Sequence, residues 1–349
     1  MNYLDSNELS ALSLGATLLG SGGGGDPTIL YGHLHYLLEK NGPIKIIQPE
    51  YLSPDALLIP IALIGAPLIS LERIPNSTLF LALFKEIKKQ HPDRECVLMP
   101  AEIGGCNALT PFMLAAQAAL PVLDADLIGR AFPQLNMCKP AILGKDKQVS
   151  YLASPYGDCL TIKTDSIAAL ESKVRDATLH FGSSAVLATF LFNAQEQDEY
   201  IIPGSLTRAL NLGRLLEKHA KDLSSLSTAT QAKKIGSGLI TEVSHSIEGG
   251  FLLGYATIKT TRGELQVFYQ NEYLLVKTRD GNNLAESPDL IALLESHSGL
   301  PLTSETLRFG LKVEIFSLAA PSFWQEPYAR SQVDLQAFGL TTDKGLAYV

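Results

Sequence analysis

The chain has 349 residues, of which 46% are hydrophobic and 18% are charged, and its formal net charge is −8. This composition is typical of a globular protein with material for about two domains. The acidic balance argues against nucleic acid as a partner, because its recognition needs a basic face. The longest apolar run, residues 57–69, is too short and too interrupted by proline to cross a membrane, and the N-terminus lacks a secretory leader pattern. We therefore expect a cytoplasmic protein.

Helical and strand-like patterns alternate through the first half of the chain. Asp5-x-x-Glu8 resembles a capping box ahead of a helical apolar face, and Asp26-Pro27 begins a second helix that ends near Asn41-Gly42. Strands are expected at 44–48, 57–63, 96–99 and 121–123, and helices at 77–90 and 112–119. The alternation predicts a three-layer α/β domain through about residue 165, continued by helices near 166–176, 182–193 and 205–219.

The second half has a different pattern. Residues 220–234 are polar and aperiodic, which predicts a surface connection and places the domain change there. The expected units are an α/β domain over 1–225 and a β-rich domain over 231–349. Short apolar–polar alternations follow at 239–245, 251–260, 264–269 and 273–278, with turn residues at 261–263 and 279–282. They predict a smaller, mostly antiparallel β domain.

Charged and polar residues follow two neighbouring strands of the first domain. The set consists of Glu102, Gly104, Gly105 and Asn107 after the first strand, and Asp124, Asp126 and Arg130 after the second. Ligands of open α/β sheets bind beyond the carboxyl ends of the strands. Clustered acids at that position are therefore candidates for a site, and the alternative is that both aspartates only cap loops.

The acids suit general acid–base chemistry. Asp124 and Asp126 alternate along an extended segment, so at most one would face a shared pocket, and Glu102 would be the second carboxylate. Carboxylates held close together have split pKa values, which gives a proton donor and a base near neutral pH. Arg130 would bind a substrate carboxylate. A divalent metal held by the three acids stays open, because carboxylate oxygens suit hard cations.

A glycine loop and a cysteine complete the N-terminal candidates. The loop matches a dinucleotide fingerprint as a string, but it follows a helix instead of a strand, and Asp26 stands where a pyrophosphate would bind, so NAD is not expected. Gly22, Gly23, Gly24 and Gly25 would instead let a ligand approach the backbone, or form a purely structural turn. Cys106 is either a nucleophile or a packing residue.

Three polar positions interrupt apolar runs in the β domain. They are Asn271, Glu272 and Asp289, and we expect them to face a crevice between the domains, where small-molecule sites often lie. The segments 22–26, 102–107 and 124–130 are expected to converge on one pocket in the N-terminal domain.

Several motifs occur in a specific order over nearly the whole chain. They are residues 19–27, 101–105 with Asn107, 124–126 with 129–133 and Met137, then 270–272, 287–291 and 308–313. Together they resemble the S-methyl thiohydantoin desulfurase family, which is associated with hydantoinase/oxoprolinase systems. The resemblance implies an α/β domain followed by a β-barrel-like domain.

The same resemblance implies a function and partners. It implies a hydrolase or desulfurase that cleaves a carbon–sulfur bond on a hydantoin-like ring. The alternative is a non-catalytic partner or assembly subunit of a hydantoinase/oxoprolinase-type enzyme. The partners expected are a small hydantoin-like molecule and either a second copy of the chain or a hydantoinase-type subunit.

Overall fold

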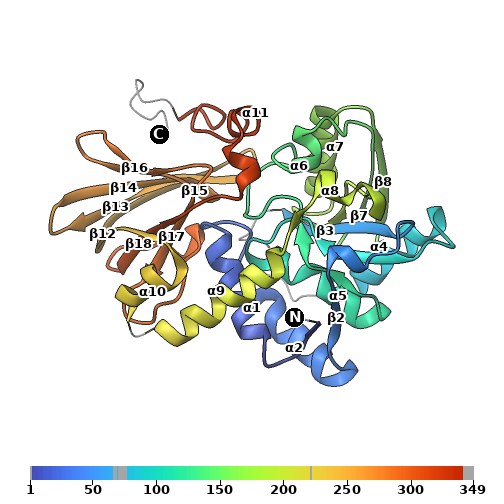
Figure 1. Ribbon diagram of the computed structural model, residues 1–349. Coiled ribbons are helices and arrows are strands. Elements are labelled where there is room, and N and C mark those ends of the chain that lie inside the picture. The colour runs from blue at the N-terminus through green and yellow to red at the C-terminus, as the bar shows by residue number, and fades with distance from the viewer. Residues whose placement is uncertain (1, 66–68, 70–76, 221, 341–349) are drawn as a thin grey trace.

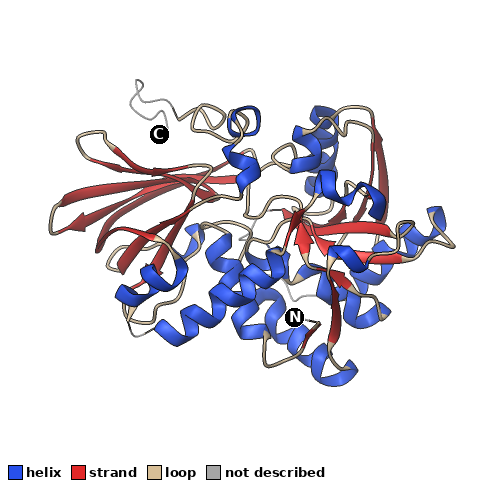
Figure 2. Cartoon of the chain, in the orientation of Figure 1, coloured by secondary structure: helices blue, strands red, loops and turns tan. Residues whose placement is uncertain are grey.

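The computed structural model describes residues 2–65, 69, 77–220 and 222–340, and its described part contains two large sheets with helices packed around them (Figures 1 and 2). The N-terminal sheet has the order β1-β2-β5-β4-β3-β9-β7-β8, with β10 beside β3. Its strands are β1 (Tyr3–Leu4), β2 (Ile44–Ile47), β3 (Leu57–Gly65), β4 (Cys96–Pro100), β5 (Val122–Leu123), β7 (Gln148–Ala153), β8 (Cys159–Thr164), β9 (Ser184–Ala188) and β10 (Phe192–Asn193). The expected mixed α/β fold is confirmed.

Two apolar cores cover the two faces of this sheet, which makes the three layers. Alternate residues of β3 point to opposite faces, so Ile59 and Ile61 belong to one core and Leu58 to the other. The first core contains the helices α1 (Leu9–Leu19), α2 (Thr28–Asn41), α4 (Thr78–Gln90), α5 (Thr110–Ala118) and α9 (Ser205–His219). Helix α7 (Ile167–His180) covers the other face.

Two sequence-based expectations are wrong in this part of the chain. Residues 182–193 form β9 and β10 instead of a helix, because Ala185, Val186 and Leu187 lie in a strand buried on both faces. A short apolar run of this kind cannot be distinguished from a buried helix by its periodicity. The stretch 220–234 contains the helix α10 (Leu223–Thr230), which packs Leu223 and Leu226 against the first core, and the start of β12.

The C-terminal sheet is an antiparallel half-barrel with the order β16-β15-β14-β13-β12-β18-β17. Its strands are β12 (Lys233–Glu248), β13 (Phe251–Thr260), β14 (Gly263–Gln270), β15 (Glu272–Thr278), β16 (Asn283–Glu286), β17 (Leu290–Glu295) and β18 (Lys312–Leu318). The sheet curls until the strands at its two ends touch, and Ile258, Val267 and Val313 fill its interior. The expected antiparallel β domain is therefore present.

The glycine loop after α1 is attached to the C-terminal sheet. The Ser21 hydroxyl donates to the Ile291 carbonyl and accepts from the Ile291 N–H, both at 2.9 Å. The Ser21 carbonyl accepts from Tyr273 N at 2.6 Å, and the Gly22 carbonyl accepts from Ser304 N at 2.8 Å. Residues of β17 and β18 also lie in the core formed by α1 and α9. The position of this loop therefore depends on both parts of the chain.

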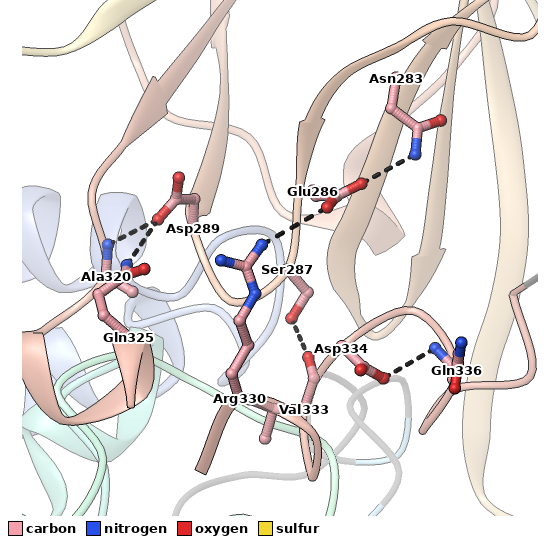
Figure 3. A network of polar contacts seen from close by, with 10 residues as sticks. All are labelled: Asn283, Glu286, Ser287, Asp289, Ala320, Gln325, Arg330, Val333, Asp334 and Gln336. Carbon is pink, nitrogen blue, oxygen red and sulfur yellow. Dashed lines mark hydrogen bonds and ion pairs between the residues drawn. The ribbon is translucent and has the colours of Figure 1, made fainter. Parts of the chain in front are cut away.

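The segment after β18 is fastened to the C-terminal sheet by a network of polar contacts (Figure 3), and one of its residues also bonds to the N-terminal part. The Asp289 carboxylate accepts from Ala320 N at 3.0 Å and from Gln325 Nε2 at 3.3 Å, and the Ser287 hydroxyl donates to the Val333 carbonyl at 2.6 Å. Next to this network, the fully buried Trp324 donates through Nε1 to the Ile128 carbonyl at 2.7 Å.

Among the described residues, no helix combines the length and apolar character needed to cross a membrane.

Candidate functional site

A cavity of about 160 Å³ opens where the glycine loop, the ends of the N-terminal strands and the C-terminal sheet meet. The polar part of its wall includes Gly23, Gly24, Gly25, Glu102, Cys106, Asn107, Gln134, Arg175, Thr189, Asn271, Glu272 and Glu305. The apolar part includes Leu63, Ile64, Leu187 and Phe190. The site is therefore built from both parts of the chain.

The structure brings together some of the sequence-predicted residues and leaves others outside. Those that line the cavity are Gly23, Gly24, Gly25, Glu102, Asn107, Asn271 and Glu272. Those outside its lining are Gly22, Asp26, Gly104, Gly105, Asp124, Asp126, Arg130 and Asp289. From the segment 124–130, only the apolar Leu127 and Ile128 reach the wall. The roles assigned to all these residues stay predictions.

Glu102 is placed by the end of β4 and oriented by two hydrogen bonds. Its Oε1 accepts from Asn107 Nδ2 at 2.6 Å, and its Oε2 accepts from Phe132 N at 3.3 Å. The Asn107 amide has a fixed orientation, because its Oδ1 accepts from Leu63 N at 2.7 Å. Burial raises the pKa of Glu102 to about 7, against the effect of these hydrogen bonds. A carboxyl group with this pKa can both take and return a proton near neutral pH.

Two glycine segments pack backbone to backbone beside Glu102. Cys106 N donates to the carbonyls of Gly24 and Gly25 at 2.9 and 3.1 Å. Gly105 has φ +56°, and a Cβ there would lie 2.3 Å from the Gly25 oxygen, so only glycine fits. The N–H groups of Gly24 and Gly25 donate to no other described residue. Both residues line the cavity.

Glu272 and Glu305 supply two further carboxyl groups from the C-terminal part. Glu272 is 2% exposed and follows Asn271, which turns the chain between β14 and β15 with φ +58°. Burial raises the pKa of Glu272 well above its usual range, and the charges of Glu102 and Glu305 raise it further. Burial also raises the pKa of Glu305. Glu272 thus interacts electrostatically with a carboxyl group from each part of the chain.

Arg130 lies behind the cavity instead of in it. Its guanidinium is fully buried, 4.4 Å from the centre of the Phe132 ring, and donates to the backbone carbonyls of Ala131, Pro288 and Asp289. Burial lowers its pKa to about 10, so the group stays cationic at neutral pH. Its hydrogen bonds hold the Pro288 loop, and its charge offsets those of the buried carboxyl groups. Its Nη2 has no partner among the described residues, and the substrate-carboxylate role expected from the sequence stays a prediction.

Asp126 holds the backbone of the segment that carries Glu102. Its carboxylate is fully buried and accepts from Ile103 N at 2.8 Å and from Gly129 N at 2.8 and 2.9 Å. Burial raises its pKa to about 7. Ile103 is the residue after Glu102, so these bonds fix the backbone that carries Glu102.

Asp124 also has a structural environment. It is 1% exposed and accepts from Gln48 Nε2 at 3.0 Å, from Thr207 N at 3.0 Å and from the Thr207 hydroxyl. Thr207 lies in the first turn of α9, where a carboxylate interacts favourably with the helix dipole. The structure therefore places Asp124 as an anchor for α9.

We expect Asp124→Asn to destabilise the protein without a specific loss of chemistry. An amide cannot accept all of these bonds, and a buried group left without its partner costs about 1–3 kcal/mol of unfolding free energy. Urea unfolding, compared with the exposed control Asp93→Asn, measures the difference. Unchanged stability together with lost turnover would return Asp124 to the catalytic candidates.

Cys106 and a metal site were left open by the sequence. Burial raises the pKa of the Cys106 thiol, so it stays protonated and lacks the activation of a nucleophilic cysteine. Within the described part of the chain, no three histidine, cysteine or acidic side chains are grouped as metal ligands would be. Glu102, Asp124 and Asp126 accordingly do not form such a group.

Several residues of the cavity wall were not predicted from the sequence, among them Glu305, Thr189 and Arg175. Glu305 lies on the short helix η4 (Ser304–Thr306), and its only local signal is a polar run, 303–306, between two leucines. Thr189 follows β9, in the segment 182–193 where the sequence pattern predicts a helix. Arg175 of α7 stacks 4.2 Å from the centre of the Phe251 ring of β13, a contact between the two parts that no local pattern indicates.

Comparisons with known proteins cover the chain almost completely. One family model, described as "S-Me-THD-like, N-terminal domain", matches residues 7–164, and another, "S-Me-THD-like, C-terminal domain", matches residues 164–345. A crystal structure of a protein from Chromobacterium violaceum has the same fold, with a TM-score of 0.81 over 97% of each chain and 22% sequence identity. No curated protein matches. The sequence-based boundary at 220–234 stays a prediction.

Proposed function

This chain belongs to the S-Me-THD-like family, and on that premise we propose that it is a hydrolase that cleaves the carbon–sulfur bond on the ring of an S-methyl thiohydantoin. The observation that carries the proposal is the Glu102 carboxyl group. It lines the cavity, has a fixed orientation, and has a pKa of about 7. Such a group is suited to remove a proton from water at neutral pH.

The proposed reaction is an addition of water followed by loss of a thiol. Glu102 takes a proton from a water molecule whose oxygen attacks the ring carbon that bears the S-methyl group. The carbon–oxygen bond forms and the ring nitrogen gains a proton. The carbon–sulfur bond then breaks, and the sulfur leaves with a proton as methanethiol, so that the ring carbon becomes the carbonyl carbon of a hydantoin.

Two other features of the cavity support this chemistry. Glu305 stays protonated to a higher pH than an ordinary glutamate, which suits it to donate the proton to the departing sulfur. The N–H groups of Gly24 and Gly25 can stabilise the negative charge that develops on the ring as water attacks. The apolar part of the wall lowers the local dielectric constant and so strengthens both interactions.

The test is direct turnover of an S-methyl thiohydantoin by the purified full-length protein. Released methanethiol is measured with a thiol reagent, and hydantoin is measured by mass spectrometry in ¹⁸O-labelled water. We expect thiol and hydantoin in equal amounts, with one ¹⁸O atom in the new ring carbonyl. Thiol release no faster than in buffer would refute the proposal, and hydantoin without ¹⁸O would exclude attack by water.

A further inference from the structure

The reaction proposed above assigns no role to Glu272, although this residue lines the same cavity. It is the first residue of β15, it is 2% exposed, and it lines the cavity together with Glu102 and Glu305, whose charges act on it. The backbone fixes it, because Asn271 accepts from Leu252 N at 2.9 Å and donates its own N–H to the Leu252 carbonyl at 2.8 Å. The backbone that carries the Glu272 side chain is therefore held by the sheet.

One oxygen of the Glu272 carboxyl group, Oε2, lacks a hydrogen-bond partner among the described residues. This oxygen is buried, and no described donor reaches it. Buried side-chain oxygens in folded proteins are nearly always hydrogen-bonded, and one that is not needs an explanation. A donor on a bound ligand would supply the missing bond.

The glycine loop leaves room for this carboxyl group. A Cβ atom at Gly23 would lie 2.0 Å from Glu272 Oε1, whereas the φ of Gly23 is outside the left-handed region. A larger residue at position 23 would therefore collide with the Glu272 carboxyl group in its present position, whereas the backbone conformation there is open to any residue. The loop and Glu272 fit each other across the boundary between the two parts of the chain.

We propose that Glu272 orients the substrate ring by accepting a hydrogen bond from a ring N–H, so that the cavity selects ligands with an unsubstituted ring nitrogen. This inference rests on the proposed function and assigns Glu272 as a specificity-determining residue in the cavity that the base Glu102 and the acid Glu305 also line. A methyl group on that nitrogen would remove the donor and collide with the carboxyl group. A site built around a hydrogen bond rejects analogues that lack the donor more strongly than it rejects analogues that differ only in apolar size.

The test compares hydantoin, 1-methylhydantoin and 3-methylhydantoin as ligands of the full-length protein, by calorimetry. We expect one of the two methylated compounds to bind at least about 10-fold more weakly than hydantoin, the loss typical of a hydrogen bond to a charged or buried partner. The Gly23→Ala variant, whose methyl group displaces the carboxyl group, should weaken hydantoin binding and remove the discrimination. Glu272→Leu, which deletes the acceptor, should do the same.

Control variants and a turnover assay distinguish failure of this inference from misfolding and from failure of the proposed function. Gly32→Ala is the matched control, because a Cβ atom there meets nothing within 4 Å, and it should bind like the wild type. If Glu272→Leu does not fold, Gly23→Ala decides. Equal binding of all three hydantoins by the wild type, or discrimination retained in Gly23→Ala, would overturn the inference. If an S-methyl thiohydantoin is turned over under those conditions, only the inference fails; if no hydantoin binds and no turnover occurs, the proposed function fails with it.

Discussion

Replacement of Glu102 by glutamine is expected to lower kcat for an S-methyl thiohydantoin by about a hundredfold or more, because a positioned general base contributes at least that much to the rate. The fold should persist. Glutamine has nearly the same shape, and its amide oxygen can still accept from Asn107 Nδ2, so that only the longer bond from Phe132 N, at 3.3 Å, is lost. Turnover and thermal unfolding of the same preparation measure the two effects separately, with the exposed Glu39→Gln on α2 as the control.

The pH dependence gives an independent check on Glu102. The base form is the ionised one, and burial raises the pKa of this carboxyl group to about 7. Therefore kcat/KM of the wild type should fall as the pH drops below about 7, whereas an ordinary glutamate would remain ionised down to a much lower pH. The residual rate of Glu102→Gln should lack this acid limb. A wild-type profile that is flat between pH 5 and 8, or a glutamine variant with full turnover, would show that another group is the base.

Removal of the C-terminal part is expected to abolish activity completely. A chain that ends at residue 225 lacks Asn271, Glu272 and Glu305 of the cavity wall. It also lacks the groups of Ile291, Tyr273 and Ser304 that hold Ser21 and Gly22. Loss of those bonds leaves the glycine loop without a fixed position.

The same truncation should also destabilise what remains. Leu290, Ala292 and Phe316 are buried in one core with Leu9 and Leu12 of α1, and their removal exposes that apolar surface to water. We expect the fragment to melt well below the full-length protein, or to aggregate, and to release no methanethiol. Circular dichroism melting and the thiol assay measure both properties. A folded fragment with full turnover would instead indicate that the β part serves assembly, as a partner subunit of a hydantoinase-type enzyme requires.

Local patterns in the sequence were sufficient for most elements. Strands β2, β3 and β4 and helices α2, α4 and α9 were predicted to within a few residues, because their apolar periodicity and their end signals lie within the element. The segment 182–193 was predicted as a helix but forms a strand, because its apolar residues pair with β3 on one side and with β7 on the other. Long-range pairing of this kind leaves no local signal.

The sequence by itself determined the α/β and antiparallel β architecture, and it identified the glycine loop and Glu102 as site candidates, since both follow from residue type and from position at the ends of elements. Only the tertiary structure decided which acids share a cavity. Asp124 anchors α9 and Asp126 holds the backbone beneath Glu102, because a carboxylate takes its role from the donors around it. Glu272 and Glu305 line the same cavity as Glu102 although more than a hundred residues separate them from it in the sequence. These side chains come together because the half-barrel packs against α1. That packing involves residues from distant parts of the chain, so no single segment of the sequence predicts it.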